Sequence, residues 1–150
     1  MNPTEPDACA ARPRGITALG CFFGFGTLAS GLAALSLLFP GGPLEPMWHI
    51  NPRGHQALIR MGGWALVLLV PVCLACAAAA FGLLRGRRWG YQLGIALLLI
   101  NLTGDVVNAG LGIEPRAVVG VPVVALLLWY LLSSRVRSFF TVRPGRIPPT

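Results

Sequence analysis

The sequence contains no lysine and few ionisable side chains of any kind. Five acidic residues and twelve arginines make up only 11% of 150 residues, whereas 55% of the chain is hydrophobic and its mean hydropathy is +0.69. A soluble domain of this length needs far more polar surface, because its ratio of surface to volume is high. The composition therefore excludes an ordinary soluble domain and predicts an integral membrane protein. The exclusive use of arginine indicates a GC-rich genome, and we expect a bacterial inner-membrane protein.

The sequence also lacks the motifs of common active sites. It has no glycine-rich phosphate loop, no paired-histidine zinc-protease helix and no nucleophile elbow. His49 and His55 have only Glu45 as a further ligand nearby, whereas metal sites usually combine three or four ligands at closer spacing. We therefore expect no metal, no cofactor and no enzymatic activity.

Four apolar runs predict an all-α fold, an integral membrane bundle of four transmembrane helices. The runs cover residues 16–39, 61–84, 91–111 and 117–134. Each is long enough, or nearly so, to cross about 30 Å of hydrocarbon at about 1.5 Å per residue. Long runs with few connections argue against a β-barrel. Residues 1–15 then form an N-terminal tail, residues 16–134 the transmembrane domain and residues 135–150 a basic C-terminal tail.

The distribution of arginine predicts that both termini lie in the cytoplasm. With the N-terminus inside, the inner segments hold nine arginines: two before the first run, three after the second and four in the C-terminal tail. The outer segments hold three, Arg53, Arg60 and Arg116. This bias follows the positive-inside rule. The tail could also contact anionic lipid or a cytoplasmic protein, whereas topology alone accounts for the net charge of +7 and no nucleic-acid binding is expected.

The third run contains a polar cluster, Asn101, Asp105 and Asn108. At about 100° per residue these side chains share one narrow helix face with Gly90 and Gly94. Small residues let helix backbones approach, and amides hydrogen-bond between helices in lipid. We therefore expect this face to point toward the other helices.

Asp105 is the one acidic residue inside the four runs. It lies about 6 Å from the middle of its run, which is well inside a half-thickness of about 15 Å. An isolated carboxylate there costs roughly 2.5 kcal/mol or more. Three arrangements would lower this cost: a protonated carboxyl, an ion pair with Arg60 or Arg116, or a water-filled cavity. We favour the ion pair, a clasp that fixes helix register, over a proton or cation relay.

Glycine and cysteine patterns provide the remaining candidate residues for helix packing and for chemistry. Gly20 with Gly24, and Gly90 with Gly94, match the spacing of close helix crossings within a bundle or in a homo-oligomer.

Cys73 and Cys76 form a C-x-x-C that resembles the motif of quinone-linked thiol oxidoreductases of the disulfide-bond-forming or vitamin K epoxide reductase kind. Cys73 lies mid-run, however, and the outer segments carry no second cysteine pair, so we expect structural thiols.

Three functions remain open. We favour a non-enzymatic accessory or scaffold bundle, because no reactive groups converge. The first alternative is a small oligomeric transporter or channel that uses Asp105. The second is a membrane thiol oxidoreductase that uses Cys73 and Cys76.

Overall fold

The computed structural model describes residues 14–110 and 117–141, and this part of the chain is 89% helical. The elements in chain order are α1 (Arg14–Leu38), the 3-10 helix η1 (Glu45–His49), α2 (Pro52–Met61), α3 (Gly63–Leu84), α4 (Arg88–Gly110), α5 (Ala117–Leu132) and α6 (Ser134–Thr141). No strand occurs among the described residues. The expectation of an all-α fold is confirmed for this part of the chain.

Three helices are long and apolar enough to cross a membrane. They are α1, α3 and α4, whose qualifying segments have 24, 22 and 23 residues. The fourth apolar run forms α5, which has 16 residues and extends about 24 Å at about 1.5 Å per residue. The helix ends at Leu132, and a separate helix, α6, begins at Ser134 instead of continuing the run.

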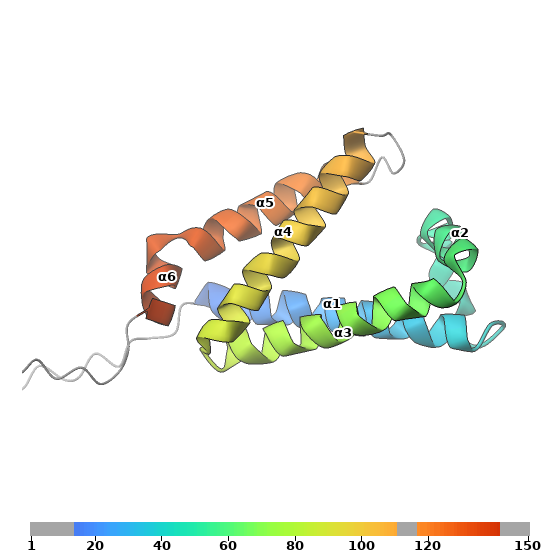
Figure 1. The fold of residues 1–150 in the computed structure, drawn as a ribbon, viewed down its shortest axis with the longest axis horizontal. Coiled ribbons are helices and arrows are strands. Elements are labelled where there is room, and N and C mark those ends of the chain that lie inside the picture. Colours follow the sequence, from blue (N-terminus) through green and yellow to red (C-terminus); the bar gives the residue numbers. More distant parts are fainter. Residues whose placement is uncertain (1–13, 111–116, 142–150) are drawn as a thin grey trace, which may run out of the picture.

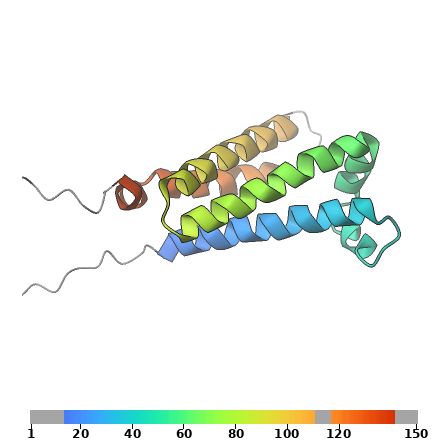
Figure 2. The same cartoon turned by 60° about the horizontal axis from the view of Figure 1, so that its bottom comes forward.

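The long helices form two antiparallel pairs. α1 packs along α3, and α4 packs along α5, while α3 and α4 contact each other across the turn that joins them. Figure 1 shows the α4–α5 pair rising away from the α1–α3 pair, and Figure 2 shows the two pairs from a second direction. We call the region where the pairs meet the α6 end, and the opposite region of the α1–α3 pair the α2 end.

The hydrophobic core is concentrated at the α6 end. Ile16, Leu19, Ala79, Leu83 and Leu131 are almost fully buried there in one cluster. Farther from this end, large apolar side chains of all four long helices are exposed, among them Phe25, Leu28, Leu74, Ile100 and Val107. Exposed apolar surface on this scale needs an apolar environment, which is what a bilayer provides.

The turn between α3 and α4 is built on three glycines. Gly86 has φ of +64°, and its N–H bonds to Leu83 O while Arg87 N–H bonds to Gly82 O, the Schellman arrangement that ends a helix. A Cβ added at Gly82 would lie 2.5 Å from Gly90 Cα. Only glycine at both positions lets the two backbones come this close, so this crossing sets the angle at which α4 leaves α3.

The α2 end carries a short amphipathic segment, η1 and α2. Asn51 caps α2 by accepting a hydrogen bond from Gly54 N–H at 2.9 Å, and Pro52 occupies the first turn. Trp48 Nε1 donates to Ser36 Oγ on α1 at 2.7 Å. The segment is thereby fastened across the end of α1.

Candidate functional site

The polar cluster of α4 lies beyond the hydrophobic core. Asn101 is exposed, and Asp105 and Asn108 are half-buried. Thr103 is also exposed, and its hydroxyl donates a hydrogen bond to Leu99 O of the same helix at 2.9 Å. Because Asn101 is exposed, its amide is accessible to a group outside α4.

Gly94 and Asn101 show where α4 separates from the α1–α3 pair. They are seven residues apart, within about 20° of each other on the helix face and about 10 Å apart along its axis. Gly94 is buried, and a Cβ added there would lie 3.3 Å from Phe23 Cε2 and 3.5 Å from Leu83 Cδ1. Asn101 on the same face is exposed. The face is thus covered by α1 and α3 at Gly94 and open at Asn101, consistent with the divergence in Figure 1.

Asp105 points toward α5. A Cβ added at Gly120 would lie 2.5 Å from Asp105 Oδ2 and 3.1 Å from its Cγ. The glycine therefore provides the space that the carboxyl occupies between α4 and α5. A larger residue at position 120 would push the carboxyl out of this space.

The two expected ion-pair partners of Asp105 have different positions. Arg60 is exposed and lies in the last turn of α2, a helix that packs on α3 and η1. Arg116 lies outside the described residues. The ion pair stays a prediction.

The expected packing glycines have different surroundings. Gly20 is buried, and a Cβ added there would lie 2.6 Å from Leu84 Cδ2 on α3. Gly90 faces the backbone of Gly82, and Gly94 faces α1 and α3 as described above. Gly24 has no atom within 4 Å of an added Cβ. Sequence spacing alone does not distinguish Gly24 from Gly20, because it carries no information on the partner helix.

The cysteines of α3 pack against α1. A Cβ added at Gly26 would lie 3.5 Å from Cys76 Sγ, and one added at Gly31 would lie 3.5 Å from Cys73 Sγ. Cys73 Sγ also donates to Thr27 O at 3.4 Å. Both thiols are free. Their contacts with glycines favour a packing role, in which sulfur fills the space that the glycines leave.

Of the two histidines at the α2 end, His55 is engaged in aromatic packing, whereas His49 is exposed. The rings of Trp48 and His55 stack with centroids 4.5 Å apart and planes 7° apart. Across the described ranges, no group of three or more His, Cys, Asp or Glu side chains could hold a metal ion. His55 therefore acts with Trp48 as part of the α2-end packing.

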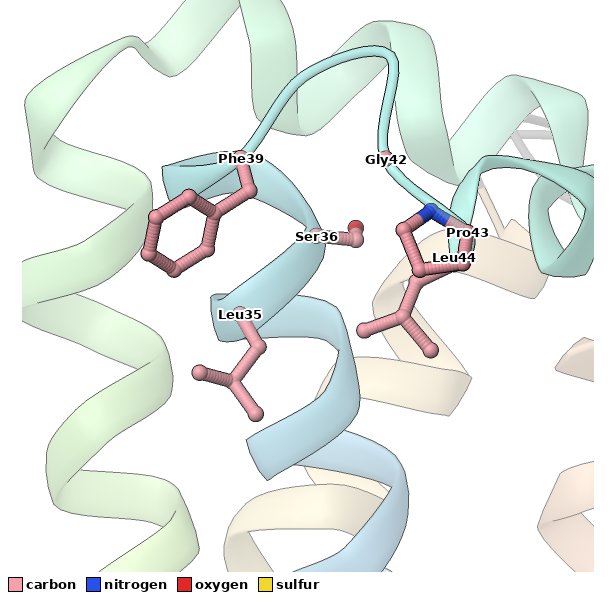
Figure 3. A pocket seen from close by; sticks show the side chains of 6 residues that line it. All are labelled: Leu35, Ser36, Phe39, Gly42, Pro43 and Leu44. Carbon is pink, nitrogen blue, oxygen red and sulfur yellow. The ribbon is translucent and has the colours of Figure 1, made fainter.

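A pocket opens at the α2 end beside this packing (Figure 3). It has a volume of about 200 Å³ and is lined by Leu35, Ser36, Phe39, Gly42, Pro43 and Leu44. Its accessible lining is entirely apolar, since the Ser36 hydroxyl is engaged by Trp48. Pockets for small-molecule ligands are usually about 300–1,000 Å³ and place several polar groups around the ligand. This pocket fits a few apolar carbons and offers no group for catalysis.

Comparison with protein-family models, with curated proteins and with solved structures finds no match to this chain. The polar cluster of α4, in which Asn101 is exposed, is therefore the feature from which a function has to be argued.

Proposed function

We propose that this chain is a four-span membrane protein that acts as a non-enzymatic assembly subunit. Its α4 would present Asn101, beside the half-buried Asp105 and Asn108, to a transmembrane helix of a second subunit. The observation that carries this proposal is the exposure of Asn101 in the middle of α4, on the same face as buried Gly94. An amide left without a partner in hydrocarbon costs about 2–7 kcal/mol, so a protein helix that can hydrogen-bond is favoured over lipid at this position.

The proposed topology places four spans in the membrane and both termini in the cytoplasm. α1, α3 and α4 are long enough to cross, and α5 runs back along α4 toward the α6 end. α5 also exposes Val119, Val123 and Leu126, as a lipid-facing helix would. An even number of spans and the arginine bias of nine to three support a cytoplasmic α6 end.

The test is the assembly state of the full chain extracted from its own membranes in a mild detergent. We expect a complex larger than the 15.9 kDa chain. Replacing both amides, in N101L/N108L, removes the hydrogen bonds at similar side-chain volume. Interhelical hydrogen bonds contribute about 0.6–2 kcal/mol, so association should weaken roughly threefold to thirtyfold.

The matched control changes the lipid-facing side of the same turns. I100L/V107L alters two exposed apolar residues of α4 without removing a polar group. It should leave the complex intact. A wild-type chain that is monomeric, or a complex that N101L/N108L leaves unchanged, would contradict the proposal.

The second candidate function is a small oligomeric transporter or channel. Its support is the half-buried carboxyl of Asp105, seated against Gly120 in a helix that is otherwise apolar. Intramembrane carboxyls commonly mark ion and proton pathways. A hydrophobic carbodiimide, which modifies protonated carboxyls in apolar surroundings, distinguishes the two functions. Labelling at Asp105 that is lost on alkalinisation and absent in D105N would favour transport over assembly.

A further inference from the structure

α6 is docked on the turn between α3 and α4. A Cβ added at Gly86 would lie 3.4 Å from Phe139 Cε1, so the Phe139 ring covers this glycine. Arg88 Nε donates to Phe140 O at 2.6 Å, and the rings of Tyr91 and Phe140 stack with centroids 4.9 Å apart. These contacts hold the basic helix α6 beside the basic turn.

The docking gathers arginines at the α6 end. We call Arg85 and Arg87 the basic rim; both are exposed. The only acidic residues among those described are Glu45, in η1, and Asp105, about 25 Å along α4 from Arg88. No described carboxylate therefore balances the charge of the basic rim.

Apolar side chains lie directly beside the basic rim. The Arg85 guanidinium lies 4.2 Å from the centre of the Phe81 ring. Phe81, Leu84 and Trp89 are exposed by 49%, 41% and 42%. Cations with apolar stems and tryptophan at the end of apolar helices are typical of the boundary between headgroups and acyl chains.

We propose that the basic rim binds the headgroup of an anionic phospholipid. The phosphate would be held by Arg85 and Arg87, and the acyl chains would lie along Phe81 and Leu84. A free phosphate could satisfy the arginines but not the exposed apolar surface beside them. A phospholipid satisfies both, which is why we assign the site to a lipid. The assignment does not depend on the function proposed for α4 or on the orientation of the chain.

The experiment uses Trp89 as a reporter of the lipid next to the basic rim. In the full chain, Trp48, Trp64 and Trp129 are replaced by phenylalanine. The protein is reconstituted in phosphatidylcholine vesicles that contain increasing fractions of brominated phosphatidylglycerol or, separately, brominated phosphatidylcholine. Bromine quenches tryptophan at short range, so the ratio of the two quenching curves measures lipid preference.

We expect phosphatidylglycerol to be preferred over phosphatidylcholine by about fivefold or more, which is the preference that one arginine near an anionic headgroup provides. This preference should fall as the ionic strength rises. R85Q/R87Q should bring the ratio close to one. R53Q/R60Q removes the same charge at the α2 end and should leave it unchanged. Helical circular dichroism of the R85Q/R87Q protein verifies that it is folded.

Three results would overturn the proposal. The first is equal quenching by the two lipids in the reporter chain with an intact basic rim, and the second is a preference that survives R85Q/R87Q. The third is loss of the preference in inorganic phosphate but not in sodium chloride of equal ionic strength, which would identify a site for a free anion.

Discussion

Replacing Gly82 with alanine tests the crossing that directs α4 away from α3. A Cβ at this position would lie 2.5 Å from Gly90 Cα and 3.1 Å from Gly90 N, whereas carbon atoms in contact lie about 3.5–4.0 Å apart. The obstructing atoms belong to a helix backbone, so no side chain can rotate away. The two helices would have to separate by about 1 Å. Overpacking of this kind costs about 1–3 kcal/mol, and we expect the upper half of that range.

The control is the same substitution in α4 away from the crossing, Gly104→Ala. An added Cβ at Gly104 has no atom within 4 Å, so it creates no clash. Its effect should be small or slightly stabilising, because alanine favours a helix over glycine by about 0.5–1 kcal/mol. The assay is equilibrium unfolding of the purified chain in mixed micelles with increasing dodecyl sulfate, followed by helical circular dichroism. If the free energies of unfolding of G82A and G104A agree within about 0.5 kcal/mol, the close contact between Gly82 and Gly90 is refuted.

Further substitutions test other contacts in the same assay. Trp48→Phe removes the hydrogen bond to Ser36 and should lower the free energy of unfolding by about 0.5–1.5 kcal/mol. Trp64→Phe, at a side chain that is 74% exposed, should lower it less. Equal losses of stability would contradict the tethering of η1 by Trp48. Gly86→Ala should cost about 1 kcal/mol because φ is +64°, and an unchanged midpoint would contradict the Schellman turn. Replacing Cys73 and Cys76 with alanine should leave the helical fold and the complex intact. Loss of a quinone-dependent thiol oxidation in this variant would instead support an oxidoreductase.

The long helices could be predicted because their signal is local. Continuous apolar runs determine α1, α3, α4 and α5 to within three residues at each end. The docking of α6 could not be predicted in this way. It depends on the contacts that Phe139 and Phe140 make with Gly86 and with Arg88. Those contacts join residues about fifty positions apart, and no local pattern reports them.

The sequence predicts which residues form the polar face of α4, but not which of them are buried or exposed. A helical wheel places Gly94, Asn101 and Asp105 on one face, because it depends only on spacing. It does not show that Gly94 is buried and Asn101 exposed. That difference depends on the angle between α3 and α4, which follows from the crossing of Gly82 and Gly90. The seat of Asp105 against Gly120 likewise depends on how α4 and α5 pair.

The most direct test of the assembly function is photo-cross-linking at position 101. A benzophenone amino acid is introduced at Asn101 or, as a control, at Ile100, the adjacent residue, which is exposed by 70% and points to another side of α4. Membranes of the producing cells are irradiated before any detergent is added. Assembly through the polar face predicts a discrete protein adduct from position 101 and none from position 100. An absence of protein adducts from position 101, or equal adducts from both positions, would contradict it.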